Sequence, residues 1–213
     1  MIWDHVWLIV LVVMDKNFET LRWGPLVTRQ YIDPLITQEL YTLGLNSTVP
    51  FDTYIYNNLD QETLYSEEQI KHFSTKLTPY INDYVLEHNT YYHRDGYPTS
   101  YNWNLDGLWI NVMGNNQFRE PHIHHNCDIS FVIYVKIPIE ALKKEGNPIS
   151  GTTVLTTGQA SDNRAKVQNI DTHIIYPYEN EMVIFPNNLL HYSVPFENKD
   201  TTRITVSGNI TLK

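Results

Sequence analysis

Scarcity of cysteine and of basic residues limits the settings in which this 213-residue chain works. Its one cysteine, Cys127, cannot form an internal disulfide, which indicates a reducing compartment, and we expect the cytoplasm. Fifteen lysine and arginine residues stand against 24 aspartate and glutamate residues, which gives a net charge of −9. Because such a surface repels polyanions, we expect neither nucleic acid nor an anionic membrane as a partner.

The chain also lacks the short motifs of several large enzyme classes. It has no glycine-rich phosphate loop, no G-x-S-x-G and no C-x-x-C. The sequence therefore gives no sign of a phosphate-binding loop, a serine nucleophile or a redox dithiol as an alternative active site.

No apolar run is long enough to cross a bilayer. The longest, residues 6–14 (VWLIVLVVM), has nine residues, whereas a spanning helix needs about 20. Asp4 and His5 precede it in place of a basic leader, and no small-residue cleavage site follows. Residues 1–17 are therefore either a first β-strand or an extension outside the fold.

The rest of the composition is that of a globular protein, with 42% hydrophobic and 18% charged residues. The length suits one domain, which we expect over residues 1–213. Within it, residues 18–102 would supply strands and helices, and residues 103–213 a jelly-roll core.

Two helices are predicted in the first half, after a strand pair over residues 21–32 that Gly24-Pro25 divides. The first helix starts at Asp33-Pro34 and should end at Gly44. The second opens at Ser66, and Gln69 completes a capping box. Pro79 should kink or divide it.

From about Trp103 onward, short β-type runs alternate with turn residues, which is typical of a sandwich or jelly roll. The two helices should then pack on the outside of one sheet. The expected strands are residues 108–113, 129–137, 152–157, 173–176, 182–185, 191–194 and 202–210.

Three histidines stand close together in 117-QFREPHIHHNCDISFVIYVKIP-138. Alternation along an extended segment puts His122 and His124 on one face and His125 on the other. Two imidazoles on one face suit a divalent metal, and His191, which follows a strand and a turn, is a candidate third ligand. The alternative is a solvated loop without metal.

Arg203 and Thr205 alternate onto one face of the last strand. A guanidinium that points into a β-sandwich requires an anion, and a neighbouring hydroxyl suits a carboxylate. The alternative is an edge-strand arginine facing solvent.

Taken together, these motifs resemble a known family. They are W-I-N at 109–111, H-I-H at 122–124, S-F-V-I-Y at 130–134, I-F-P at 184–186, His191 and R-I-T-V-S-G-N at 203–209. The series is similar to the bacterial and phage 2-oxoglutarate/Fe(II)-dependent oxygenases. The resemblance runs from about Leu21 to the C-terminus and is dense from Trp109.

The resemblance implies a mainly β protein with flanking helices, built on a double-stranded β-helix (a cupin-like jelly roll). It makes His122 and His191 iron ligands, with His124 at the position of the usual carboxylate ligand. We favour His124 as the third ligand, and the alternative is a nearby carboxylate such as Asp128 or Glu120.

The resemblance also implies that Arg203, with Thr205 beside it, binds the distal carboxylate of 2-oxoglutarate, and that the Tyr134 phenol adds to the same anion. Fe(II), 2-oxoglutarate and dioxygen would be required, with ascorbate as a reductant. The enzyme would hydroxylate a C–H bond of a small-molecule or peptidyl substrate and release succinate and carbon dioxide.

Two other functions remain open at this point. One is a cupin-type metalloenzyme that uses three histidines without 2-oxoglutarate, and the other is a non-catalytic β-sandwich that serves in binding or structure. An inward-facing Arg203 separates the oxygenase from the cupin-type enzyme, and metal analysis after anaerobic purification separates the non-catalytic sandwich from both enzymes.

Three further residues bear on the resemblance. Phe131 stands where relatives are expected to have glycine. In the turn 178–181, Asn180 is the residue at ease in a left-handed conformation. Cys127 is either a neighbour of the iron or a small half-buried residue, and we favour the second interpretation.

Overall fold

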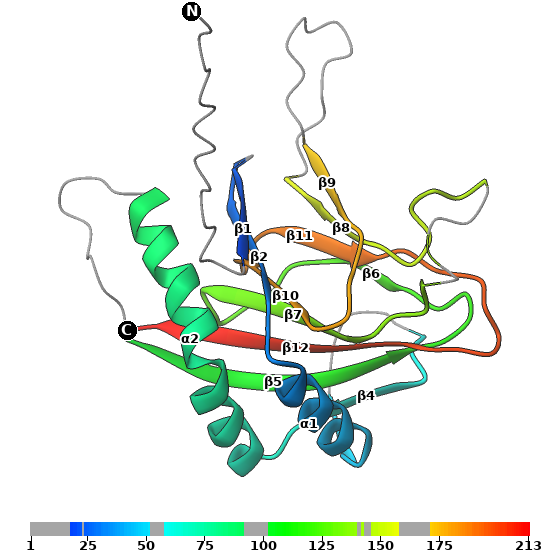
Figure 1. The fold of residues 1–213 in the computed structure, drawn as a ribbon, viewed down its shortest axis with the longest axis horizontal. Helices are drawn as coiled ribbons and strands as arrows, with labels where there is room; N and C mark the ends of the chain where they lie inside the picture. The colour runs from blue at the N-terminus through cyan, green and yellow to red at the C-terminus, as the bar shows by residue number, and fades with distance from the viewer. Residues whose placement is uncertain are drawn as a thin grey trace, which may run out of the picture.

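Two antiparallel sheets face each other in the computed structural model of this chain (Figure 1). The structure describes residues 18–22, 24–51, 58–91, 102–139, 142, 146–157 and 171–213. The predictions for residues 1–17, including the apolar run 6–14, lie outside the described residues.

The larger sheet has eight strands in the order β1-β2-β10-β7-β12-β5-β4-β3, and the smaller has four in the order β6-β11-β8-β9. Strands of the larger sheet are β1 (Phe18–Arg22), β2 (Leu26–Tyr31), β3 (Val49–Pro50), β4 (Gln61–Leu64), β5 (Trp103–Met113), β7 (Ile129–Lys136), β10 (Glu181–Pro186) and β12 (Arg203–Leu212). Strands of the smaller sheet are β6 (Arg119–His122), β8 (Thr153–Thr156), β9 (Thr172–Ile175) and β11 (Leu190–Ser193). Of the seven expected strands, six are present within one or two residues of their predicted ends, and the first, expected over residues 108–113, begins five residues earlier at Trp103.

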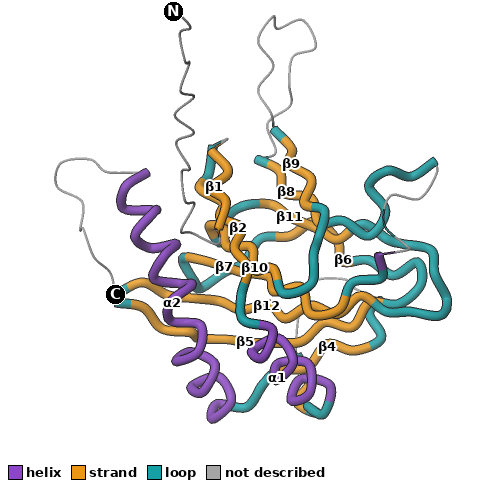
Figure 2. Tube along the Cα trace, viewed as in Figure 1, coloured by secondary structure: helices purple, strands orange, loops and turns teal. Residues whose placement is uncertain are grey.

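Both helices lie on the outer face of the larger sheet, as predicted (Figure 2). α1 (Pro34–Leu45) is capped by Asp33, whose side chain accepts a hydrogen bond of 2.9 Å from the backbone N–H of Leu35. The prediction that Gly44 ends this helix is wrong, because the helix continues to Leu45. A Cβ on Gly44 would lie 2.7 Å from Ile110 Cδ1 and against the Tyr65 ring, so this glycine allows α1 to approach the sheet closely.

The capping box at the start of α2 (Glu67–Tyr91) is confirmed. Gln69 N–H donates to Ser66 Oγ at 3.2 Å, and Ser66 N–H donates to Gln69 Oε1 at 2.8 Å. Pro79 does not divide the helix, which runs unbroken for 25 residues. Pro79 lies on the exposed side, where water can hydrate the carbonyl that its missing N–H leaves without a partner.

Successive side chains of β12 point to opposite faces of the larger sheet, one toward the helices and the other toward the smaller sheet. Ile204, Val206 and Ile210 face the helices and join the larger apolar core, which includes the fully buried α2 residues Phe73, Leu77 and Ile81. Burial of each such side chain stabilises the fold by about 1.5–3 kcal/mol. Polar residues instead occupy the opposite face of β12, between the sheets, and this is where a site is positioned.

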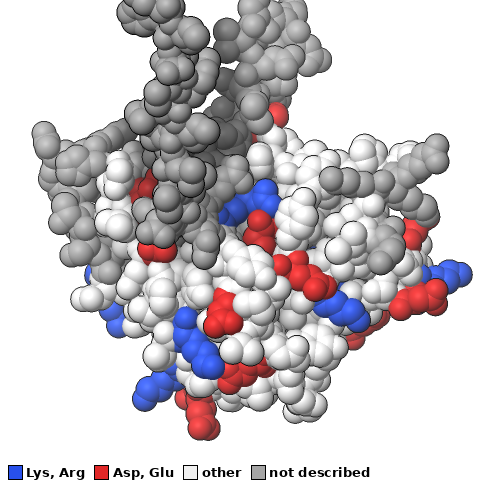
Figure 3. All heavy atoms as spheres, in the orientation of Figure 1, with Lys and Arg blue, Asp and Glu red and all other residues white. Residues whose placement is uncertain are grey.

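On the face shown in Figure 3, acidic and basic side chains are interspersed. Neither described helix combines the length and the apolar character that crossing a bilayer requires.

Candidate metal centre

The smaller sheet brings two of the predicted ligands together. His122 ends β6 and His191 lies on β11, and the two residues are direct partners in the antiparallel pairing of these strands. Their ring centroids are 4.2 Å apart. A separation of 69 residues in sequence therefore becomes direct contact through one strand pair.

His124 lies in the loop after β6, not on a strand. Its backbone N–H donates to the Asn187 carbonyl at 2.9 Å, and Asn187 Nδ2 donates to the His124 carbonyl at 3.1 Å. Asn187 is in the turn before β11, so this pair of bonds ties the His124 loop to the element that carries His191. His125 is exposed, as alternation predicted.

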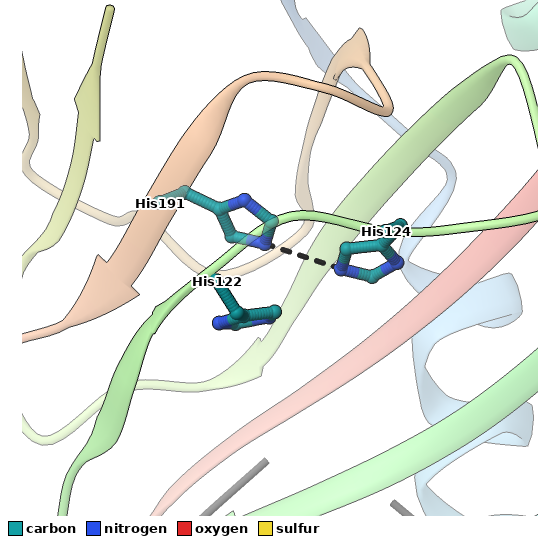
Figure 4. Close-up of side chains that lie close together, drawn as sticks. All are labelled: His122, His124 and His191. Atoms are coloured by element: carbon teal, nitrogen blue, oxygen red, sulfur yellow. Dashed lines mark hydrogen bonds between the residues drawn. The ribbon is translucent and has the colours of Figure 1, made fainter. Parts of the chain in front are cut away.

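The three imidazoles converge on one point (Figure 4). One ring nitrogen from each of His122, His124 and His191 lies within 4.8 Å of the other two. The Nε2 atoms of His124 and His191 are 3.2 Å apart. Within the described part of the chain, this is the one cluster of at least three side chains with metal-ligand chemistry.

The second nitrogen of each ring is already engaged. Nδ1 of His122 donates to the Glu120 carbonyl at 2.7 Å, and Nδ1 of His191 donates to the Leu189 carbonyl at 2.9 Å. Nδ1 of His124 donates to Asn209 Oδ1 at 2.7 Å. Each ring therefore turns an Nε2 lone pair toward the common point, the arrangement that ligating histidines adopt. Lone pairs at this separation repel each other unless a cation lies between them, so the residues fit a bound divalent metal.

Burial keeps these rings neutral. It lowers the pKa of His122 to about 3 and that of His124 to about 4, and it brings the pKa of His191 well below its ordinary value. The positive charge of Arg119 acts in the same direction on all three. At neutral pH each imidazole is therefore uncharged, with its proton on Nδ1 and its Nε2 free to bind a metal.

No carboxylate joins the cluster among the described residues. Asp128 is exposed, and its Oδ2 accepts a hydrogen bond of 2.8 Å from the backbone N–H of Leu212. Glu120 contacts His122 through its backbone carbonyl, which accepts from Nδ1. Cys127 is half-buried, and burial raises the pKa of its thiol, which matches the structural interpretation of this residue.

Arg203 is buried between the sheets with only 3% of its surface exposed. Its Nη1 donates to Ser193 Oγ at 3.2 Å and its Nη2 to Thr153 Oγ1 at 2.8 Å, while no residue in the described ranges accepts from Nε. These partners are neutral hydroxyls, and burial lowers the pKa of the guanidinium. A buried cation without a countercharge is unfavourable, so this arrangement points to an anionic ligand.

Arg203 and the histidines line the same cavity. Thr205 and Ser207 continue its wall along β12, and Asn111 on β5 donates to Ser207 Oγ at 3.2 Å. Trp109 lines it as well and stacks on His124 with ring centroids 5.6 Å apart. One cavity therefore offers a metal site at one position and an anion site at another.

The Tyr134 ring packs against the guanidinium of Arg203. Its hydroxyl donates to Thr153 Oγ1 at 2.9 Å, and its ring centroid is 5.4 Å from Arg203 Cζ. Tyr134 is fully buried and is not among the residues that line the cavity. Its structural contact is thus with Thr153 and Arg203.

Sequence reasoning missed Arg119, a buried residue that lines the cavity. On β6 it forms an ion pair with Glu62 of β4. The position of Arg119, three residues before His122, could have suggested that it lies near the site. Its partner Glu62 is 57 residues away in sequence, so no local pattern indicates the ion pair.

The family model described as "Putative 2OG-Fe(II) oxygenase" matches residues 107–209, a range that contains the three histidines and Arg203. Residues 107–209 are therefore similar to the 2OG-Fe(II) oxygenases. The resemblance stated from the motifs is confirmed, and with it Fe(II), 2-oxoglutarate and dioxygen as the cofactor and cosubstrates. No curated protein sequence matches the chain.

Solved structures confirm the double-stranded β-helix fold of these oxygenases. A prolyl-4-hydroxylase from Pseudomonas putida is 11% identical, with a TM-score of 0.53 over 92% of this chain and 93% of that chain. A prolyl hydroxylase from Trichoplax adhaerens, in complex with a hypoxia inducible factor peptide fragment, is 10% identical, with a TM-score of 0.51 over 92% and 84%. The epimerase SnoN from nogalamycin biosynthesis is 9% identical, with a TM-score of 0.54 over 92% and 78%.

Proposed function

We propose that this oxygenase hydroxylates a C–H bond of a small-molecule or peptidyl substrate while 2-oxoglutarate is converted to succinate and carbon dioxide. The observation that carries the proposal is the shared cavity, in which three imidazoles converge beside a buried guanidinium that has no acidic partner among the described residues. A metal site that did not use 2-oxoglutarate would have no need of Arg203. A purely structural sandwich would need neither group.

In this proposal His122, His124 and His191 hold Fe(II) through their Nε2 atoms. Fe(II), when bound, would activate dioxygen, which takes two electrons from 2-oxoglutarate as it is decarboxylated to succinate and two from the substrate C–H bond. The chain's part is to keep the three rings neutral and oriented, through the acceptors at Nδ1 and through burial. Since all three ligands are uncharged, the site retains the full charge of the metal, which favours an anionic cosubstrate.

Arg203 binds the distal carboxylate of 2-oxoglutarate, with the Thr205 hydroxyl beside it on the same strand face. A guanidinium is suited to this role because it donates two parallel hydrogen bonds to a carboxylate. Tyr134 contributes by fixing Thr153 and by packing its ring against the guanidinium. These contacts keep Arg203 oriented before the ligand arrives.

The hydroxylase assignment is supported by two fold neighbours that are prolyl hydroxylases. Leu59, Trp109 and Met113 give the cavity apolar walls. Such walls suit a substrate C–H bond and exclude bulk water from it.

The test is release of succinate from 2-oxoglutarate in the presence of Fe(II), ascorbate and dioxygen. Wild-type protein is expected to release succinate slowly even without substrate, and Arg203→Met is expected to abolish this release. Arg29→Met is a matched control, because Arg29 is paired with Glu181 and does not line the cavity. Absence of succinate with the iron-loaded wild type would overturn the proposal, as would full activity of Arg203→Met.

A further inference from the structure

The three histidines are oriented in different ways. His122 and His191 each donate Nδ1–H to a backbone carbonyl two residues earlier in their own strand or turn, at 2.7 and 2.9 Å. His124 instead donates to a side chain, Asn209 Oδ1, at 2.7 Å. Of the three rings, only that of His124 therefore depends on the identity of another residue.

Asn209 is itself held in place. It lies on β12, six residues after Arg203, and its Oδ1 also accepts a hydrogen bond of 3.1 Å from Ser130 Oγ. Ser130 is fully buried on β7. The amide oxygen is thus fixed by one donor from the neighbouring strand and one from the histidine.

Two other contacts of His124 do not choose between its nitrogens, whereas the His191 Nε2 atom, 3.2 Å from His124 Nε2, could accept a proton placed there and so competes with Asn209 in the metal-free protein. The backbone bonds to Asn187 place the loop, and the stack on Trp109 fixes the plane of the ring. Neither contact distinguishes a ring protonated at Nδ1 from one protonated at Nε2. An imidazole binds metal only through an unprotonated nitrogen, so the choice decides whether Nε2 is available.

We propose that Asn209 is the positioning residue that makes His124 a metal ligand, by holding the ring proton on Nδ1 and so presenting Nε2 to the metal. The inference rests on the proposed function, in which His124 stands at the position of the usual carboxylate ligand. β12 then carries both the residue that anchors the cosubstrate, Arg203, and the residue that sets the third ligand.

The experiment titrates metal-depleted protein with Co(II) under anaerobic conditions and compares three variants. Asn209→Leu has the same shape but cannot accept a hydrogen bond, and it should weaken Co(II) binding by about 10- to 100-fold. Asn209→Asp can only accept, so it should bind Co(II) at least as tightly as the wild type. Ser130→Ala removes the other donor to the same oxygen and should change the affinity little.

A readout that needs no metal accompanies the titration. In the metal-free wild type, nitrogen NMR of the imidazoles should show His124 protonated at Nδ1, and Asn209→Leu should move that proton to Nε2. Thermal unfolding shows which variants are folded. Should Asn209→Leu fail to fold, Asn209→Asp and the wild-type tautomer decide the matter.

Three results would overturn the inference while leaving the proposed function intact. They are a His124 ring protonated at Nε2 in the metal-free wild type, Co(II) binding by Asn209→Leu equal to wild type, and weakening by Asn209→Asp as large as that expected for Asn209→Leu. Failure of the wild type to bind Co(II) would instead remove both proposals.

Discussion

Replacing Arg203 with methionine should weaken ligand binding without weakening the fold. The guanidinium is buried and donates to the hydroxyls of Ser193 and Thr153, and its Nε has no hydrogen-bond partner among the described residues. Its desolvation is therefore offset only in part in the ligand-free protein. Methionine has a similar length and no charge.

The expected changes have opposite signs. Replacing buried ionic groups by apolar ones of similar volume ranges from neutral to stabilising by about 4 kcal/mol, so the free energy of unfolding should stay the same or rise. A desolvated contact between the guanidinium and a carboxylate contributes about 2–5 kcal/mol, so the affinity for 2-oxoglutarate should fall by about 30-fold to about 4,000-fold.

Two measurements check this prediction. Urea unfolding of the metal-free proteins gives the stability difference, and calorimetric titration of the Mn(II)-loaded proteins gives the 2-oxoglutarate affinity without turnover. An unchanged 2-oxoglutarate affinity in Arg203→Met would refute the assignment of the anion site. A large loss of stability with the affinity unchanged would make Arg203 a structural residue.

Three further predictions concern the ligand set, the support of Arg203 and the packing of α1. His124→Ala should lose most of its Co(II) affinity while Asp128→Ala keeps it; equal loss in both would return Asp128 to the ligand set. Tyr134→Phe removes one hydrogen bond to Thr153 and should weaken 2-oxoglutarate binding by only about 1 kcal/mol, and a calorimetric loss as large as that of Arg203→Met would mean that the phenol contacts the anion directly. Gly44→Ala should destabilise the fold by about 1–3 kcal/mol, because its Cβ meets Ile110 and Tyr65; Gly107→Ala, whose Cβ lies 3.8 Å from the nearest atom, is the control in urea unfolding.

Local signals were sufficient for the parts of the fold that depend on neighbouring residues. Asp33, Ser66 and Gln69 cap their helices as predicted, since a cap is complete within four residues of chain. Asn180 takes the left-handed conformation expected of it, with φ of 66°. The apolar β runs after Trp103 are also local patterns, and they are strands.

Features set by packing across the molecule were not predictable in this way. Local sequence predicts that Gly44 ends its helix, but the glycine is needed because Tyr65 and Ile110 pack against it. No local pattern links these two residues to Gly44. β6 is four residues long and contains Pro121, so it lacks a strand pattern of its own. The ion pair of Arg119 with Glu62 on β4 follows from the same tertiary placement.

The candidate site falls between these cases. Alternation was enough to turn Arg203 and Thr205 to one side, and both are buried and line the cavity. Alternation alone did not place His124, which leaves the strand and is held by Asn187 and Asn209. That His124 and His191 meet follows from the β10–β11 turn, whose carbonyl and amide groups bind the His124 loop.

The most direct test of the central claim is a crystal structure of the protein grown without oxygen in the presence of Mn(II) and 2-oxoglutarate. The account predicts one metal ion bound by the Nε2 atoms of His122, His124 and His191, with the distal carboxylate of 2-oxoglutarate against the guanidinium of Arg203. A metal bound elsewhere, or a distal carboxylate away from Arg203, would contradict it.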